Sequence, residues 1–562
     1  MHVFLRSPGL AALFCGLFAV TGCIQPIPRK ALPECDVCIT VSPTAGEPAL
    51  NVEVRLSEPV EEYRFEPLNK PQRSRGWTVP GDEWQFDGEL VSRTDGQPFN
   101  RFVVRLTEDE RFFDRRYVAV DRVGDESWLL FLGALAPATG SMSVRFERFG
   151  REAVVRDGRT VVPVSRFTLR YENDDRLIYV GSRRHFLTVA EGIVAGSEAP
   201  TWLTSRVSET MNTVLSSATE GFGVAPSSLP TVYVTSKAGD SGAGYKGGVL
   251  SQGVMAIRLR GIDLDAPDED LIEIVNNTVA HEAVHFWIGQ DYPNADEETQ
   301  SWLHEGSTEY LADRFRVSSE LVVDEAETRL NACRIGLGDL ALDGSRGPVH
   351  GSMPYDCGYA MNFFAEIASL RAGNGDIAAI WRRVLQRTEA PGFTAESFLA
   401  VANEAGENAA DDLFRRFLQG KSGRRSGLDG ALRNLGIETT SRLPDRREGH
   451  RLRLAVLMPL LGSLCKDSYG FMTFDDHIKL DTGKRCGNDL EGDPEIVRIG
   501  EYSILEQPYK AYLYSRTVCG NSGALALWQK DALAPLTVPC NATIELLPEL
   551  LEFTNTPGLP PV

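Results

Sequence analysis

Short runs of alternating apolar and polar residues dominate the chain from about residue 36 to 180. Clear examples are 50–56 (Leu-Asn-Val-Glu-Val-Arg-Leu), 102–106 (Phe-Val-Val-Arg-Leu) and 143–146 (Ser-Val-Arg-Phe). A repeat of two residues, with turn-forming residues between the runs, is typical of strands that bury one face. The pattern predicts an antiparallel β-sandwich or open sheet. Because no set of catalytic side chains accompanies it, we interpret this region as a spacer or platform.

Helical and strand patterns mix further along the chain. One helical pattern lies within 186–220, and strands are predicted at 231–234 and 254–259. Residues 239–248 are rich in glycine and are interpreted as a loop, which lacks the Lys-Ser/Thr ending that holds a phosphate.

A helical period follows from an acidic start at 265–270 to an expected end at Gly289. A second helix is expected over about 299–315. Residues 358–420 also look helical, and from about 445 onward short strand-like runs return. Breaks in the long helical stretch are expected at Gly373, Gly375 and Pro391.

The start of the chain has the pattern of a signal peptide rather than of a folded element. Arg6 precedes an apolar stretch over 10–20 that is too short to span a membrane. Val20-Thr21-Gly22-Cys23 resembles the lipobox of bacterial lipoproteins. The resemblance implies that Cys23 is acylated and anchors the protein to a bacterial membrane in the cell envelope, facing the periplasm or the surface. The alternative is an ordinary signal peptide with a chance cysteine.

The number of cysteines and the net charge indicate the compartment and exclude one class of partner. Without Cys15 and Cys23, eight cysteines remain, an even number that fits an oxidising compartment. A formal net charge of -20 argues against nucleic acid as a partner and is read as solubilising. Spacing does not prove the connectivity, but neighbours are expected to pair: 333 with 357, 465 with 486, 519 with 540, and Cys35 with Cys38 as a small structural disulfide. A redox or metal pair is the alternative for Cys35 and Cys38.

The strongest chemical signal is His281-Glu282-Ala283-Val284-His285, followed by Trp302-Leu303-His304-Glu305-Gly306. Histidines four residues apart project from one helix face, and a glutamate on the next helix completes three ligands for one zinc ion per chain. Glu282 would lie beside the metal and act as general base on the attacking water, then as acid toward the leaving amine. Glu309 lies one turn after Glu305 and is expected to accept a hydrogen bond from a ligand histidine.

These segments resemble the gluzincin superfamily, which includes thermolysin and the aminopeptidase N and glycyl aminopeptidase families. Residues 302–306 are similar to the Trp-Leu-Asn-Glu-Gly of aminopeptidase N relatives, with His304 in place of asparagine. The spacing from His285 to Glu305 is one residue longer than theirs and equals that of thermolysin. The resemblance implies a thermolysin-like catalytic domain that hydrolyses peptide bonds with zinc. In such enzymes a strand like the one predicted at 254–259 lies beside the cleft and pairs with extended substrate.

A second stretch, 353–360 (Met-Pro-Tyr-Asp-Cys-Gly-Tyr-Ala), resembles the Pro-Tyr-Glu-Lys-Gly-x-Ala segment of the aminopeptidase N family. In that family the tyrosine hydroxyl stabilises the tetrahedral oxyanion. The resemblance implies this role for Tyr355. Packing at a helix start is the structural alternative for Tyr355, and His350 is the alternative residue for the catalytic role.

One departure concerns the substrate's free amino group. Exopeptidases of these families bind it with a glutamate on a glycine-rich strand, and the matching place here is 247–251 (Gly-Gly-Val-Leu-Ser). Leu250 or Ser251 stands where the acid belongs, so the choice between endopeptidase and aminopeptidase stays open. Asp296 or Glu298 on the intervening loop is a candidate replacement.

The C-terminal region faintly resembles the PDZ domain of glycyl aminopeptidases at 469–471 (Tyr-Gly-Phe) and 493–500 (Asp-Pro-Glu-Ile-Val-Arg-Ile-Gly). An unrelated β-domain pinned by disulfides is the alternative. We therefore expect a multidomain α+β fold. Its parts are a signal peptide (1–22), a tether (23–35), an N-terminal β-sandwich (36–180), a thermolysin-like catalytic domain (186–330), a helical subdomain (331–440) and a C-terminal β-rich, PDZ-like domain (450–555).

The sequence predicts a zinc metallopeptidase of the cell envelope that acts on a peptide or protein substrate. Two alternatives remain open. One is a catalytically silent lipoprotein that binds peptides or an envelope partner, and the other is a zinc hydrolase with a non-peptide substrate. The oligomeric state is not predicted.

Overall fold

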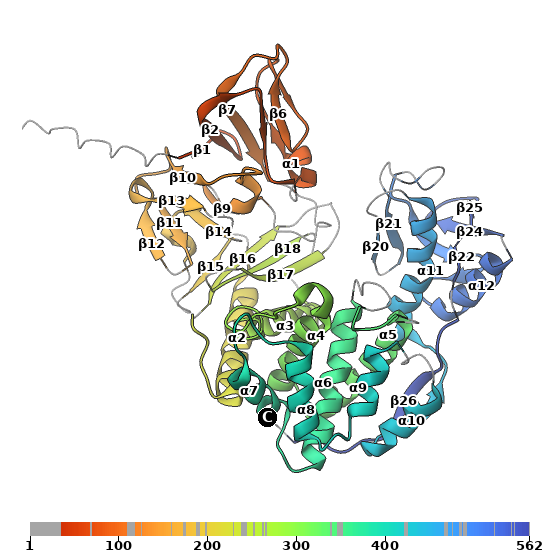
Figure 1. The fold of residues 1–562 in the computed structure, drawn as a ribbon. Helices are drawn as coiled ribbons and strands as arrows, with labels where there is room; N and C mark the ends of the chain where they lie inside the picture. The colour runs from red at the N-terminus through yellow and green to blue at the C-terminus, as the bar shows by residue number, and fades with distance from the viewer. Residues whose placement is uncertain are drawn as a thin grey trace, which may run out of the picture.

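A computed structural model shows a chain built from a β-rich N-terminal part, a central α+β part and a C-terminal β-rich part (Figure 1). No helix among the described residues is long and apolar enough to cross a membrane. The predicted signal peptide and Cys23 lie outside those residues. The structure describes residues 35–560 with gaps at 68–69, 109–118, 125, 159, 172–175, 187–191, 197–198, 229, 238–243, 251–252, 261–263, 265–266, 338–339, 345–351, 421–424, 466–469, 475, 483–485, 487–489, 491, 522, 541 and 545.

The N-terminal part contains two main sheets that share one hydrophobic core. Burial alternates along β2 as predicted: Val52 and Val54 are buried, whereas Asn51 and Glu53 are partly exposed. The first sheet is not purely antiparallel, because β1 and β10 pair in parallel. Its order is β13 (Thr168–Tyr171), β10 (Met142–Phe146), β1 (Val37–Pro43), β2 (Ala49–Val60), β7 (Phe99–Thr107), β4 (Trp77–Thr78). The second is β12 (Thr160–Pro163), β11 (Val154–Asp157), β14 (Leu177–Gly181), β9 (Ser127–Phe131), β8 (Val120–Gly124). A small third sheet joins β3 (Glu62–Arg64), β6 (Leu90–Arg93) and β5 (Trp84–Phe86), and α1 (Lys70–Gly76) lies beside β4.

The central part begins with a four-stranded sheet in the order β15 (Ile193–Ala195), β16 (Thr231–Lys237), β18 (Val254–Arg260), β17 (Gly244–Leu250). Two expectations are corrected here. Strand β18, expected beside the cleft, is an interior strand, and β17 is the edge strand that contacts helix α3. Residues 244–248, expected in a loop, belong to β17, because antiparallel pairing with β18 supplies hydrogen-bond partners for their backbone. The glycine-rich sequence by itself does not predict this pairing.

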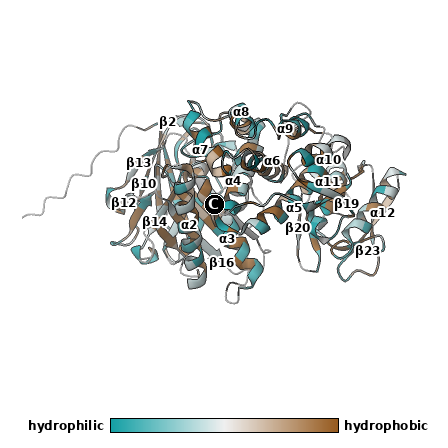
Figure 2. Ribbon diagram, turned by 90° about the horizontal axis from the view of Figure 1, so that it is seen from below, coloured by the Kyte–Doolittle hydropathy of each residue, from teal (hydrophilic) through white to brown (hydrophobic). Residues whose placement is uncertain are grey.

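Helices cover this sheet and continue as a layer with the same core (Figure 2). The predicted breaks occur, since α6 ends before Gly373 and Pro391 lies between α7 and α8. Helix α5 continues across residue 330. The helices are α2 (Thr201–Phe222), α3 (Glu269–Val284), α4 (Glu297–Arg316), α5 (Ser319–Leu337), α6 (Met353–Arg371), α7 (Ile377–Arg387), α8 (Ala395–Ala405), α9 (Asp411–Leu418) and α10 (Arg425–Asn434).

The C-terminal part has its own core, and the predicted disulfides Cys465–Cys486 and Cys519–Cys540 lie within it. Cys333–Cys357 and Cys35–Cys38 are also formed, as expected. Its sheet runs β20 (Gly470–Thr473), β21 (Ile478–Asp481), β22 (Glu495–Ile499), β24 (Ala524–Gln529), β25 (Leu536–Pro539), with β23 (Tyr502–Ser503) beside β22. Helices α11 (Gly449–Leu464) and α12 (Pro508–Gly520) pack on it.

The last strand leaves that domain and returns to the helical layer. Strand β26 (Leu550–Asn555) pairs with β19 (Glu438–Arg442) and docks against α5. The amide of Asn331 on α5 donates to the carbonyl of Leu551 at 2.7 Å and accepts from its N–H at 2.8 Å. The C-terminal segment is therefore anchored to α5, one of the helices of the central layer.

Candidate metal centre

Helix α3 carries His281 in its last turn, and His285 is the C-cap residue that directly follows the helix. Its N-terminus is capped by Asp268, whose carboxylate accepts from the N–H of Leu271 at 2.7 Å. Val275 and Val279 are buried in the shared core and set the rotation of the helix. His281 and His285 consequently face the same side, toward helix α4, and the chain turns away at Gly289 with a φ of 126°.

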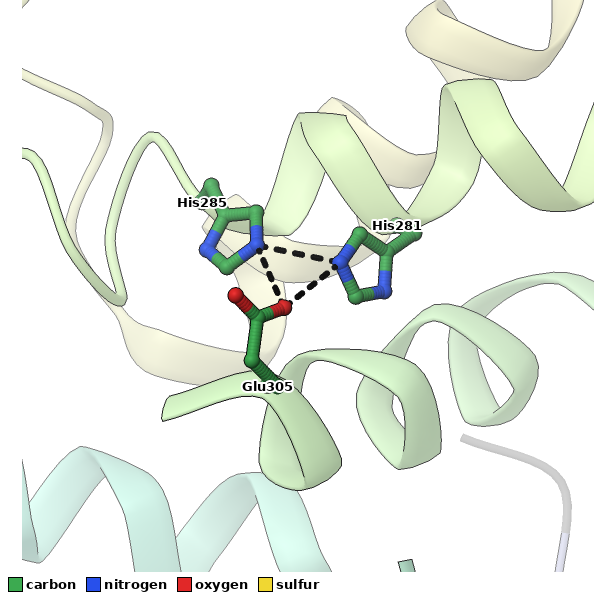
Figure 3. A group of neighbouring side chains, drawn as sticks. All are labelled: His281, His285 and Glu305. Carbon is green, nitrogen blue, oxygen red and sulfur yellow. Dashed lines mark hydrogen bonds and ion pairs between the residues drawn. The ribbon is translucent and has the colours of Figure 1, made fainter. Parts of the chain in front are cut away.

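Three predicted ligands converge on one point (Figure 3). Nε2 of His281 lies 3.2 Å from Oε2 of Glu305 and 3.0 Å from Nε2 of His285. Nε2 of His285 lies 3.5 Å from the same oxygen of Glu305. Tetrahedral zinc with bonds of about 2.0–2.1 Å requires ligand atoms about 3.3 Å apart, so this donor set fits the ion.

The outer nitrogen of each histidine also has a partner. Nδ1 of His281 lies 2.7 Å from Oε2 of Glu309, as expected from the sequence, and Nδ1 of His285 lies 2.9 Å from the carbonyl oxygen of Ile288. When each Nδ1 carries the proton and donates, the lone pair of each Nε2 is directed to the convergence point.

The carboxylates around the site are held in their charged form. Burial alone would raise the pKa of Glu305, but hydrogen bonds with His281 and His285 hold that pKa well below its usual range. Burial opposes the charge of Glu309 too, yet Arg329 and His281 lower its pKa to about 2. Nη2 of Arg329 lies 2.6 Å from Oε1 of Glu309. Both glutamates are therefore anionic at neutral pH, as their contacts require.

Glu282 and Tyr355 flank the same point. Glu282, 9% exposed, directly follows His281 on α3. The ring of Tyr355, half-buried in the first turn of α6, lies 5.7 Å from the ring of His281. Burial, a hydrogen bond with Glu305 and the nearby charge of Glu282 raise the pKa of Tyr355 above its usual value, so the hydroxyl stays protonated and can donate. His350 lies outside the described residues.

Close packing of α4 against α6 brings Tyr355 to Glu305. A Cβ on Gly358 would overlap the carbonyl oxygen of Trp302, and a Cβ on Gly306 would overlap the Cα of Gly358. The glycine of each resemblance segment thus sits where the two helices cross. Sequence reasoning noted these glycines as parts of motifs and missed their packing role.

Several neighbours of the site were not predicted. Arg329 on α5 pairs with Glu309, and the ring of His304 stacks on that of His285 at 4.5 Å between centroids. Asp296, a candidate for holding a substrate amino group, is the N-cap residue of α4, and its carboxylate accepts from the N–H of Thr299 at 3.4 Å. Ser251 and the side chains of Leu250 and Glu298 lie outside the described residues.

Comparison with known proteins places the fold. No family model matches the chain, and no curated protein matches it in sequence. A crystal structure of an aminopeptidase N family protein from Idiomarina loihiensis matches with a TM-score of 0.56 at 13% identity, covering 92% of this chain and 98% of that one. The chain therefore has an aminopeptidase N-like multidomain α+β architecture, as the sequence predicted.

Two further solved structures match less closely. One is an M1 zinc metallopeptidase from Deinococcus radiodurans, a mutant bound to a Tyr-Ser-Ala substrate, with a TM-score of 0.36, 14% identity and coverage of 68% of this chain and 93% of that one. The other is aminopeptidase A from Legionella pneumophila in complex with aspartic acid, with a TM-score of 0.39, 12% identity and coverage of 69% and 50%.

Proposed function

We propose that this protein is a zinc-dependent peptidase. The observation that carries the proposal is the triangle of His281, His285 and Glu305, whose ligand atoms all lie within 4.8 Å of one another. Glu282 on the same helix and Tyr355 on the facing helix supply the two other groups that amide hydrolysis requires. The aminopeptidase N-like architecture supports the same conclusion.

Each residue has a distinct part in the reaction. His281, His285 and Glu305 would hold the ion, which when bound polarises the scissile carbonyl and makes water more acidic. Glu282 removes a proton from the attacking water and passes it to the leaving amine. The hydroxyl of Tyr355 donates a hydrogen bond to the carbonyl oxygen as negative charge develops there. Glu309 keeps His281 oriented with Nε2 toward the ion.

The decisive experiment compares the wild type with Glu282→Gln on a complex peptide mixture, with products read by mass spectrometry. Hydrolysis by the wild type alone is expected, and the variant should still contain one zinc per chain. A chelator should abolish the activity and added zinc should restore it. Internal cuts would define an endopeptidase, and stepwise N-terminal loss would define an aminopeptidase. Identical behaviour of the two proteins would contradict the proposal and favour a silent binding protein.

We also propose that Cys23 carries a lipid anchor in a bacterial cell envelope. The four disulfides among the described residues support an oxidising compartment. Wild-type protein expressed in a bacterial host should sediment with membranes and incorporate labelled fatty acid. Cys23→Ser should do neither, and labelling of that variant would contradict the proposal.

A further inference from the structure

A network of hydrogen bonds and ion pairs links the candidate metal centre to the C-terminal domain. It begins at His281, whose Nδ1 lies 2.7 Å from Glu309, and continues to Arg329 at 2.6 Å. Arg329 donates to Oδ1 of Asp356 at 3.1 Å. The other oxygen of Asp356 pairs with Arg451. The five residues come from five helices, α3, α4, α5, α6 and α11, the last of which opens the C-terminal domain.

Asp356 connects this network to Tyr355, the proposed oxyanion donor. It directly follows Tyr355 in the first turn of α6, and it is 1% exposed. The N-cap residue of α6, Ser352, makes no side-chain capping hydrogen bond, so the start of the helix is held from outside by Arg329 and Arg451. Two guanidinium groups on one buried carboxylate fix its position in two directions.

Arg451 is itself held firmly. Its side chain is 13% exposed and lies in the first turn of α11. The segment before it is tied to α5, since Arg442 and Arg447 both pair with Glu327, and Arg442 also pairs with Glu448 at the N-cap of α11. The position of Arg451 is therefore set by α5 and by the C-terminal domain together.

We infer that Arg451 is a positioning residue for Tyr355, through which the C-terminal domain completes the active site. Without Arg451, Asp356 would depend on Arg329 alone, which also serves Glu309 and Glu325. The first turn of α6 would then lose one of its two outer anchors, and the tyrosine hydroxyl would move relative to Glu305. The inference rests on the proposed role of Tyr355.

Kinetics of five variants, including Tyr355→Phe alone and combined with Arg451→Met, test the catalytic consequence. Arg451→Met is expected to lower kcat about tenfold or more with little change in KM, because a small misplacement of a group acting in the transition state is costly. Arg451→Lys should recover part of the loss. In a Tyr355→Phe background, Arg451→Met should have almost no further effect. Arg453→Met is the matched control on α11, since Arg453 makes no ion pair with a described residue, and it should leave kcat unchanged.

A fluorine NMR signal from 3-fluorotyrosine at position 355 separates this inference from the proposed function, because it needs no activity. The resonance should shift or broaden in Arg451→Met, move less in Arg451→Lys, and stay in place in Arg453→Met. An unchanged resonance in a folded Arg451→Met protein would overturn the inference even if peptidase activity were established. If Arg451→Met lowered kcat equally with and without the Tyr355→Phe substitution, that result would overturn it too.

Discussion

Oε2 of Glu309 lies 2.7 Å from Nδ1 of His281, and the other oxygen of that carboxylate lies 2.6 Å from Arg329. His281, a proposed zinc ligand, is thereby oriented by a group that is itself held in place. Glu309→Ala should weaken zinc binding about 10–100-fold, because the histidine loses the acceptor that fixes its tautomer. Competition with a fluorescent zinc chelator measures this. Asp324→Asn, an exposed carboxylate on α5, is the control, and equal affinity of Glu309→Ala and wild type would contradict the role.

Removing the hydroxyl of Tyr355 should affect turnover far more than binding. Tyr355→Phe retains the ring that lies 5.7 Å from the ring of His281 and removes only the donor. We expect kcat to fall about 10²–10³-fold with KM nearly constant, as for other lost oxyanion donors. Zinc content should be unchanged. A proportional rise in KM without a fall in kcat would instead assign the hydroxyl to substrate binding.

The crossing of α4 and α6 should not tolerate a methyl group at Gly358. A Cβ there overlaps the carbonyl oxygen of Trp302, so Gly358→Ala must push the helices apart and displace Glu305 from Tyr355. We expect a loss of about 1–3 kcal/mol in the free energy of unfolding, and a larger loss of activity than stability alone explains. Gly430→Ala on α10 meets nothing within 4 Å and should be neutral or stabilising by up to about 1 kcal/mol. Chemical denaturation compares the two.

A buried ion pair joins the same two helices. Arg314 is 1% exposed and Glu366 is 0% exposed, and their charged atoms lie 2.9 Å apart. Arg314→Met should cost about 3–5 kcal/mol in the free energy of unfolding, because the fully buried carboxyl group of Glu366 loses its charged partner. The double variant Arg314→Met, Glu366→Met should recover most of that loss. If the double variant were as unstable as Arg314→Met, the loss would not come from leaving Glu366 without its partner, and this explanation would be wrong.

Asp313 should make folding stability depend on pH. Burial and repulsion by Glu309 raise the pKa of Asp313 from 3.8 to about 6, with its carboxylate accepting a hydrogen bond from Tyr359. The folded state thus binds this proton more tightly than the unfolded state, so the contribution is full below pH 3.8 and is lost as pH rises through about 6. Asp313→Asn mimics the protonated form.

Urea denaturation of wild type and Asp313→Asn at two pH values measures this contribution. The variant should be more stable than wild type by about 1–3 kcal/mol at about pH 7.5 and nearly equal to it at about pH 4. A constant difference between the two proteins at both pH values would show that Asp313 does not titrate in this range.

Local sequence was sufficient for the features that repeat within one element. Four-residue spacing alone puts His281 and His285 on one face of α3, and the alternation over 50–56 alone identifies a strand of the first sheet. Turn chemistry located the break between α6 and α7, and sequence neighbours identified all four disulfides among the described residues.

Tertiary packing decided everything that depends on a partner distant in sequence. The glycine-rich strand β17 exists because β18 pairs with it, and a glycine run alone carries no such information. Arg329, Asp356 and Arg451 meet because α5, α6 and α11 pack together, while each residue by itself looks like an ordinary surface charge. The periodicity of a segment determines which of its residues share a face, but which faces meet is set by the free energy of burying them together, a property of the whole chain.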